Sequence, residues 1–403
     1  MRFKGRFMPS ALMALAIGLS TADDASSADA LTVNMVYLSK EVERLAPISL
    51  LDPIEIPDEG LAGAKLGQED NATTGSFLGH DYQLTEIRVP IDGDLLESAK
   101  STLAGGARLL VVDAPADDLL AIAGLPEAAD ALLFNVGAED DRLRTEECRP
   151  NLFHIIPSRA MKADALAQYL LWKRWREWYL IHGTAEPDLL MKAAIERAAT
   201  KFGAEIVETR AYEYEATARR TDTGHVQIQT QLPVFTQDAA EHDIIIAADE
   251  SDVFGEYLSY RSWDPALIAG THGLRPTAWH RSHEQWGGTQ MQGRFEDGAG
   301  RWMTEKDYAA WLAVRALGEA VTRTNVADPA ALRDYLRGDD FEIAAFKGEG
   351  LTFRTWNQQM RQPVLLVAPR VLVSVSPQDE FLHQRTPLDT LGFDQPESQC
   401  SLS

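Results

Sequence analysis

Short apolar runs alternate with helical patterns along nearly the whole chain, and this alternation is what most constrains its fold. In the first part, the expected strands are 31–38, 81–90, 107–115 and 131–137, and the expected helices are 59–72, 94–104 and 116–123. A strand that runs parallel to its neighbour needs a long crossover, usually a helix. The pattern therefore predicts an α/β fold in which helices cover both faces of a parallel sheet.

The same pattern begins again after Pro157. The expected elements there are the strands 175–183, 204–214, 242–249 and 265–270, and the helices 158–173, 186–201, 225–238 and 251–260. A polar break at 138–157 separates the two runs, and a second crossing lies at 275–286. We expect two α/β lobes, with a ligand cleft at the carboxyl ends of their parallel strands.

The last part of the chain returns to the first lobe and then crosses again. The expected elements are an amphipathic helix at 303–323, a short helix at 329–337, and β-rich segments at 341–346, 350–356 and 363–375. The predicted lobe 1 comprises residues 31–150 with 286–340, lobe 2 comprises 151–280 with 341–375, and the tail is 376–403.

One helix has an unusual composition. In "GAKLGQEDNATTG" (63–75), Gly63 and Gly67 lie one helical turn apart, and small residues on one face favour close packing against a sheet. Asn71 and the threonines after it compete for backbone hydrogen bonds, so the helix is expected to end there, with Gly75 as its left-handed stop. The Asn71-Ala72-Thr73 sequon is interpreted as turn chemistry.

The N-terminus has the three parts of a secretory signal peptide. Basic residues in "MRFKGRFMPS" precede the short apolar run "ALMALAIGL", and small residues follow at Ala28 and Ala30. The apolar run is shorter than the ~20 residues that span a bilayer. Residues 1–30 are therefore predicted to be a signal peptide, and the mature, exported chain is predicted to begin at Leu31.

The chain has only two cysteines, Cys148 and Cys400. An isolated pair in an exported protein favours one disulfide, which here would close a very long loop and hold the C-terminus. Two unrelated thiols remain the alternative, because sequence does not show proximity.

The charge balance limits the kinds of partner. The formal net charge is −23, whereas binding to nucleic acid needs a basic surface, so no nucleic-acid partner is expected. A small anionic ligand is still possible, because it responds to the local field of its cleft.

The chain resembles a known family. "GAKLGQEDNATTGSFLGHDYQL" (63–84) is similar to the first helix and second strand of type I periplasmic binding proteins, the group that includes the leucine/isoleucine/valine-binding proteins. "LLVVDAPADD", "LLFNVGAEDDRLR" and "MTEKDYAAWLAVRALGEA" extend the similarity over most of the mature chain. The resemblance implies two Rossmann-like lobes joined by a hinge of crossing segments. It further implies a monomeric periplasmic receptor, not an enzyme, that serves the membrane permease of an ABC transporter.

Other segments of the sequence resemble one branch of that family. "CRPNLFHIIPSRAMKADALAQYL", "RRTDTGHVQIQTQLPVFTQ" and "HEQWGGTQMQGRFE" are similar to binding proteins associated with alcohol oxidation that depends on pyrroloquinoline quinone (PQQ). The branch implies PQQ as the bound ligand, with no cofactor required. An amino acid or another organic acid is the alternative ligand.

Two loops depart from the amino-acid-binding relatives. The loop after the fourth strand, 137–142, lacks the hydroxyl side chains that hold an α-carboxylate in those relatives. The loop after the third strand, 113–116, lacks the usual serine and glycine. These departures put an ordinary α-amino acid ligand in doubt.

A flat polycarboxylate needs forked arginine donors and an aromatic surface. Arg142, Arg220 and Arg281 are the expected donors, and Trp279 and Trp286 the expected aromatic surfaces. The other predicted ligand-binding residues are at the expected strand ends and crossings: Tyr37, Asp113, Ala114, Asn135, Gly137, His182, Asp249 and His272.

Catalytic and metal motifs are weak. "HRSHEQW" (280–286) is not HExxH, and GxSxG, P-loop and CxxC motifs are absent from the sequence. No metal site is expected. An exported enzyme, or an accessory protein of quinone-dependent alcohol oxidation, remains the alternative from another class.

Overall fold

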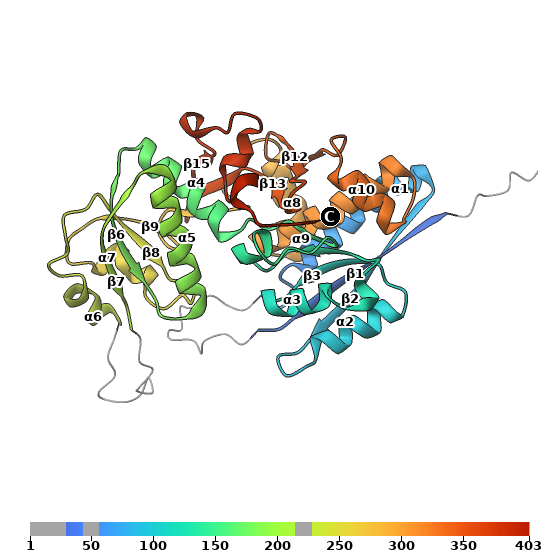
Figure 1. Cartoon of the computed structure of the whole chain (residues 1–403), viewed down its shortest axis with the longest axis horizontal. Helices are drawn as coiled ribbons and strands as arrows, with labels where there is room; N and C mark the ends of the chain where they lie inside the picture. The colour runs from blue at the N-terminus through green and yellow to red at the C-terminus, as the bar shows by residue number, and fades with distance from the viewer. Residues whose placement is uncertain (1–29, 43–55, 214–227, 403) are drawn as a thin grey trace, which may run out of the picture.

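The computed structural model describes residues 30–42, 56–213 and 228–402, which form two lobes side by side (Figure 1). The first lobe contains a parallel sheet with strand order β2-β1-β3-β4-β5. Its strands are β1 (Leu31–Lys40), β2 (His80–Val89), β3 (Leu109–Asp113), β4 (Leu132–Asn135) and β5 (Leu152–His154). The predicted α/β class with parallel sheets is confirmed.

The central strands of this sheet are buried on both faces. In β1, Met35 and Tyr37 pack into one hydrophobic cluster, whereas Val36 and Leu38 pack into another. Successive side chains of a strand point to opposite faces, so an unbroken apolar run can serve two cores.

Helices cover both faces of the first sheet. The helices on one face are α1 (Leu61–Leu78), α8 (Gly288–Ala299), α9 (Glu305–Thr324) and α10 (Pro329–Arg337), and those on the other are α2 (Leu95–Ala104) and α3 (Ala116–Ala123). Helix α8 was not predicted, because its sequence carries three glycines within twelve residues and has a low helical propensity.

Helix α1 corrects two expectations. It continues through Gly75 and ends at Gly79, which has a left-handed φ of 75°. The helix does not stop at Asn71, because the Asn71 side-chain amide donates to the carbonyl of Val314 on α9 (2.8 Å) instead of competing for backbone groups of its own helix. The small residues also face α9 and not the sheet, since a Cβ on Gly67 would lie 2.9 Å from the carbonyl oxygen of Trp311.

The second lobe has its own parallel sheet, with strand order β7-β6-β8-β9. The strands are β6 (Glu177–His182), β7 (Glu205–Ala211), β8 (Ile244–Ala248) and β9 (Leu267–Gly270). One face packs against α4 (Arg159–Trp172) and α5 (Glu186–Phe202), and the other against α6 (Ile228–Phe235) and α7 (Gly255–Arg261). Helix α7 begins later than expected, because Asp249 holds the residues before it in a loop.

Short strands join the two lobes. They are β10 (Arg275–Thr277), β11 (Ile343–Ala344), β12 (Gly350–Phe353), β13 (Met360–Arg361), β14 (Val364–Ala368) and β15 (Val371–Ser376). Side chains of β11–β13 pack into the core of the first lobe, whereas Val364 and Leu366 pack into the core of the second. The range 341–375, expected in lobe 2, is therefore divided between the two cores.

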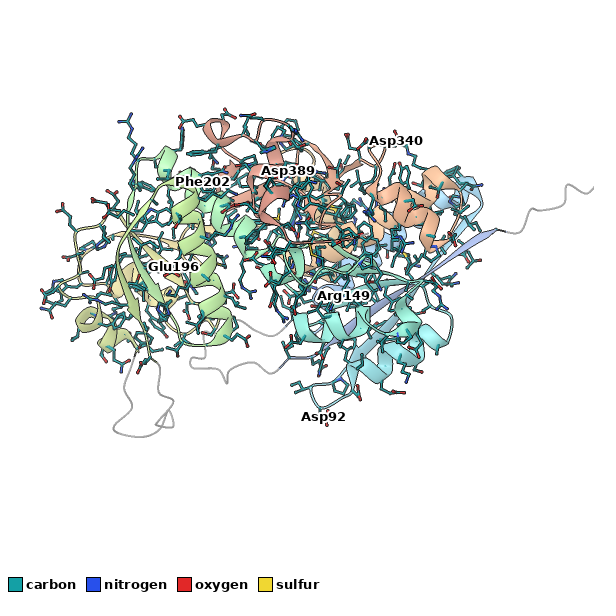
Figure 2. The ribbon with its side chains drawn as sticks, viewed as in Figure 1. Asp92, Arg149, Glu196, Phe202, Asp340 and Asp389 are labelled. Atoms are coloured by element: carbon teal, nitrogen blue, oxygen red, sulfur yellow. A yellow bond between two sulfur atoms is a disulfide. The ribbon has the colours of Figure 1, made fainter. Side chains whose placement is uncertain are left out.

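The C-terminal tail contacts both lobes. A disulfide joins Cys148 and Cys400, as the sequence predicted, across a separation of 252 residues. Earlier in the tail lies Asp389, which is labelled in Figure 2. Its carboxylate accepts from the guanidinium of Arg354 (2.9 Å). Lys201 on α5 donates to the carbonyl of Gly392 (2.9 Å). The tail thus holds the first lobe through the disulfide and the second lobe through α5.

None of the helices in residues 30–42, 56–213 and 228–402 is long and apolar enough to cross a membrane. The predicted signal peptide lies outside the described residues, except for Ala30.

Candidate functional site

Two adjoining hollows lie between the lobes. The strand-end hollow has a volume of about 330 Å³ and is lined by the loops after β3 and β4 together with the start of α5. The hinge hollow has a volume of about 730 Å³ and is lined by the loops after β8 and β9, the segment 275–281 and the start of α9. Glu139 lines both. The cleft lies at the carboxyl ends of parallel strands, where the alternation of elements places it.

The strand-end hollow contains four of the predicted residues: Asp113, Ala114, Gly137 and Arg142. Gly137 packs so closely on the Asp113 side chain that a Cβ would not fit. Asn135 is buried beneath this loop, where its amide donates to the carbonyl of Ala138 (2.7 Å) and its oxygen accepts from the Ala138 amide (2.8 Å). Asn135 therefore shapes the loop without lining the hollow.

Carboxylates neutralise the cations of this hollow. Arg142 forms ion pairs with Asp117 and Glu147, which raise the pKa of the guanidinium against the opposing effect of its partial burial. Lys306 lies 3.2 Å from Asp113. The hollow therefore offers no unpaired arginine fork among its described residues.

The floor of the cleft is an ion-pair network at the start of α4. Arg159 donates to Glu250, after β8 in the second lobe (2.7 Å), and to Asp140, after β4 in the first lobe (3.0 Å). Burial lowers the pKa of Arg159, but the hydrogen bonds and negative charges of Glu250, Glu139 and Asp140 outweigh it, so the net shift is upward. Arg159 is thus a charged link between the lobes.

Lys162, one helical turn later, forms the second part of the network. Its ammonium donates to Glu139 (2.6 Å) and Glu305 (2.7 Å), and the side chain is almost fully buried. Burial opposes the charge, yet the two carboxylates raise the pKa of Lys162 above its ordinary value. The cleft floor therefore carries fixed, compensated charges.

The hinge hollow contains Asp249, His272, Trp279 and Arg281 from the predicted set. Asp249 accepts from the backbone amides of Val253, Phe254 and Gly255; burial raises its pKa, and these hydrogen bonds only partly offset the rise.

His272 and Trp279 are also held by neighbouring groups. His272 lies 2.9 Å from the Asp252 carboxylate, whose pKa is lowered chiefly by that hydrogen bond. Trp279 is buried and stacks on Tyr308, with ring centroids 4.8 Å apart. Most predicted groups in this hollow thus already have partners within the protein.

Three of the remaining predicted residues, Tyr37, His182 and Trp286, line neither hollow. Tyr37 is buried beside the strand-end hollow, where its hydroxyl donates to Asp113 (3.4 Å). Its pKa is raised well above its usual range by burial first, and then by nearby carboxylates. His182 is buried, with Nδ1 2.7 Å from the carbonyl of Gly183. Trp286 is 65% exposed and lies against Gly348, away from the cleft. Arg220 lies outside the described residues.

Sequence reasoning missed Arg159 and Lys162. The signal was present, because both are charged residues at the start of an alanine- and leucine-rich helix that follows a lobe crossing. Their partners Glu139, Glu250 and Glu305 come from three distant segments, so the pairing could not be seen in the sequence. The structure describes no cluster of three or more potential ligands for a metal ion in residues 30–42, 56–213 and 228–402.

The strand-end hollow has the chemistry to bind a small amphipathic molecule. Pro115, the N-cap of α3, supplies no side-chain cap, and it lines the hollow together with Ala116. The acidic side chains of the first turn, Asp117 and Asp118, are paired with Arg142 and Lys40. Amides at a helix N-terminus favour a carboxylate. Apolar surface comes from Val42 in the first lobe and Leu190 in the second. A molecule bound here would contact both lobes.

No family model and no curated protein sequence matches this chain. Solved structures, in contrast, match nearly its whole length. A branched-chain amino acid ABC transporter periplasmic ligand-binding protein from Burkholderia xenovorans is 17% identical with a TM-score of 0.71, covering 92% of this chain and 99% of its own.

Two further solved structures match 93% and 86% of this chain. A leucine-, isoleucine-, valine-, threonine- and alanine-binding protein from Brucella ovis is 15% identical with a TM-score of 0.65, covering 93% of this chain and 99% of its own. An ABC transporter substrate-binding protein from Desulfitobacterium hafniense, in complex with Leu, is 15% identical with a TM-score of 0.63, covering 86% and 99%. At sequence identities this low, the matches establish a shared fold and nothing beyond it. The chain therefore has the two-lobed fold of the type I periplasmic binding proteins of the leucine/isoleucine/valine-binding kind.

Proposed function

We propose that the chain is the substrate-binding protein of an ABC-type transport system and acts in the periplasm with a membrane permease. The observation that carries this proposal is a cleft lined from both lobes in a chain that aligns over 92% of its length with a protein of that kind. Two lobes joined by crossing segments can close over a ligand. Binding without chemical change is the expected activity.

The ligand we propose first is a small apolar amino acid. Its carboxylate would meet the uncapped amides of α3, which take the place of the missing hydroxyl side chains. Its side chain would contact Val42 and Leu190. A zwitterion suits the strand-end hollow because the cations that line it are already paired with carboxylates of the protein. The solved complex with Leu from Desulfitobacterium hafniense agrees with this class.

PQQ stays a prediction and is the second ligand to test. A polycarboxylate needs unpaired guanidinium groups, and Arg142 is engaged with Asp117 and Glu147. The cleft therefore favours a zwitterion over a polyanion. We expect an organic acid with one carboxylate to bind more weakly than the zwitterion and more tightly than the polyanion.

Calorimetric titration and thermal unfolding test the proposal with L-leucine, L-alanine, PQQ and butyrate as separate ligands. A ligand present at 100 times its dissociation constant adds ~2.7 kcal/mol to the free energy of unfolding. Stabilisation by leucine and recovery of unchanged leucine would support a receptor. Tight binding of PQQ and of no other ligand would mean that PQQ, and not an amino acid, is the ligand. Chemical turnover of any ligand would contradict the receptor function.

Two adjacent leucines on α5 provide a matched pair of variants. Leu190 is 36% exposed and lines the strand-end hollow, whereas Leu189 is 45% exposed and does not. Leu190→Asp should weaken leucine binding at least tenfold, a change of ~1.4 kcal/mol. Leu189→Asp should bind like the wild type. Equal binding by both variants would place the ligand elsewhere.

A further inference from the structure

A third hollow adjoins the hinge hollow at the crossing segment. The outer hollow has a volume of about 680 Å³, and its lining comes from the segment 281–285, from Trp302 before α9, and from the turn between β14 and β15 at 370–372. It shares Arg281 and Trp302 with the hinge hollow. It is separate from the strand-end hollow, with which it shares no lining residue.

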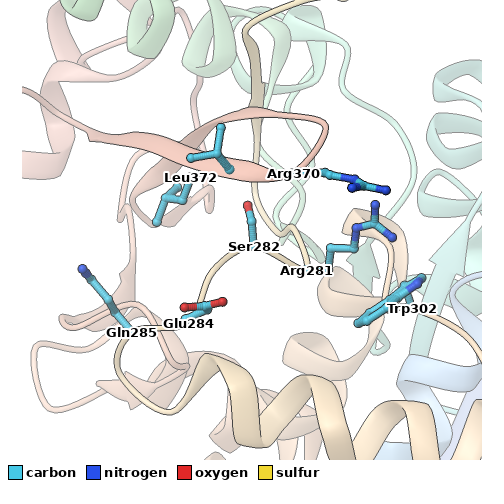
Figure 3. Close-up of a pocket in the computed structure, with 8 residues that line it drawn as sticks. Arg281, Ser282, Glu284, Gln285, Trp302, Arg370 and Leu372 are labelled. Carbon is cyan, nitrogen blue, oxygen red and sulfur yellow. The ribbon is translucent and has the colours of Figure 1, made fainter.

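Two guanidinium groups meet in the outer hollow. Figure 3 shows the side chains of Arg281 and Arg370 pointing toward one another. Arg281 lies over the ring of Trp302, 5.1 Å from its centroid, and donates to the carbonyl of Pro369 (3.4 Å). Neither arginine has a carboxylate within ion-pair distance in the part of the chain that the structure describes. Two like charges held together in this way repel each other, and a bound anion would relieve the repulsion.

The field around this segment is positive although the whole protein is acidic. The pKa of His280, next to Arg281, is lowered to about 4, first by burial and then by the charges of Arg275 and Arg281. Glu284 is the one carboxylate that lines the outer hollow, and it lies beyond Ser282 from the two guanidinium groups (Figure 3). An anion approaching Arg281 and Arg370 therefore meets a local charge opposite to the net charge of −23.

The apolar part of the lining is Trp302, Val371 and Leu372, beside the polar Ser282 and Gln285. Trp302 is 49% exposed, Val371 is 51% exposed and Leu372 is partly exposed. A carboxylate fits a guanidinium through two parallel hydrogen bonds, and exposed apolar side chains gain from covering an apolar body. We propose that the outer hollow binds an organic anion whose carboxylate lies between Arg281 and Arg370 and whose apolar part contacts Trp302, Val371 and Leu372.

This site is independent of the cleft ligand, and the test keeps the two apart. The probes are 4-phenylbutyrate, 4-phenylbutanol and 4-phenylbutylamine, which share one body and differ in charge, together with inorganic phosphate. Ligand-detected NMR on the full mature chain gives the dissociation constants. We expect the carboxylate to bind at least tenfold more tightly than the alcohol or the amine, and more tightly than phosphate. Equal binding of the three organic probes would overturn the proposal, and tighter binding of phosphate would leave no role for the apolar lining.

Arg370→Gln is the key variant, since Arg370 does not line the cleft. It should lose five- to tenfold in affinity for 4-phenylbutyrate while leucine binding is unchanged. Arg281→Gln should lose as much, and Arg281→Lys should recover only part, because an ammonium lacks the fork. Arg385→Gln, at an exposed arginine outside the hollow, is the control and should bind like the wild type. If both glutamine variants match the control, the site does not exist.

Discussion

Two lysines are buried to nearly the same extent in two regions of the molecule, and their surroundings shift their pKa values in opposite directions. Lys162, on the cleft floor, is 6% exposed and donates to two carboxylates, which raise its pKa. Lys347, in the first-lobe core, is 5% exposed and donates to the carbonyl of Pro363 (2.8 Å) and to the amide oxygen of Gln362 (3.4 Å). Burial lowers the pKa of Lys347 to about 7, with only a partial offset from Glu305. Burial alone therefore does not decide the charge of a lysine; its partners do.

The same distinction separates the arginines. Arg159 is buried, and its charge is balanced by a carboxylate from each lobe, Asp140 and Glu250, so it links the two lobes. Arg281 and Arg370 are exposed and have no carboxylate partner in the described part of the chain, so they are available to a ligand. Of the cations expected to hold a ligand in the cleft, Arg142 is engaged in ion pairs, Arg281 has no carboxylate partner among the described residues, and Arg220 lies outside them.

Replacing Lys162 by methionine should give the largest effect. Loss of one partner from a buried ion pair leaves the other charge uncompensated and costs ~3–5 kcal/mol. Here Glu139 and Glu305 would both be left on the cleft floor. Urea unfolding of Lys162→Met measures the loss. Lys192→Met is the control, because Lys192 forms an (i, i+4) pair with Glu196 on the surface of α5, and such pairs contribute only ~0.2–0.5 kcal/mol.

The contribution of Lys347 to stability should depend on pH, because burial lowers its pKa. Between its folded pKa of about 7 and its ordinary value of 10.5, the unfolded chain binds a proton that the folded protein does not, so stability rises as pH rises. From about pH 7.5 to about pH 9.5 the rise should be roughly 2–3 kcal/mol, because each pH unit contributes ~1.4 kcal/mol. Lys347→Met should lack this contribution.

The measurement is the difference between the unfolding free energies of wild type and Lys347→Met at several pH values. Other groups that titrate are common to both proteins, so the difference isolates Lys347. A difference that stays constant with pH would mean that Lys347 remains charged in the fold, and the contrast with Lys162 would disappear.

Two glycines, one at a close helix contact and one in open space, allow the same kind of comparison for packing. Their replacement should change stability the least. A Cβ on Gly67 in α1 would lie 2.9 Å from the carbonyl oxygen of Trp311, whereas a Cβ on Gly293 in α8 would meet no atom within 4 Å. Gly67→Ala should cost ~1–3 kcal/mol, because the two helices must move apart. Gly293→Ala should gain ~0.5–1 kcal/mol from the higher helical propensity of alanine. Thermal unfolding of the two variants should therefore shift in opposite directions, and shifts of the same sign would contradict the close α1–α9 packing.

The sequence by itself determined the alternation of strands and helices, the two parallel sheets and the cysteine pair. These features are local or nearly so: an apolar run such as 107–115 specifies a strand buried on both faces wherever it is placed. The expected strand ends include Asp113 and Gly137, and both residues line the strand-end hollow.

Only the tertiary structure decided which charges meet and which helices touch. Asn71 ends no helix because α9, more than two hundred residues away in sequence, presents the carbonyl of Val314 to it. Arg142 is neutralised by Asp117 and Glu147, and Trp286 lies against Gly348 outside the cleft. A charged or aromatic side chain has the same identity in every environment, but its pKa, its exposure and its partners depend on groups that the fold brings from distant segments.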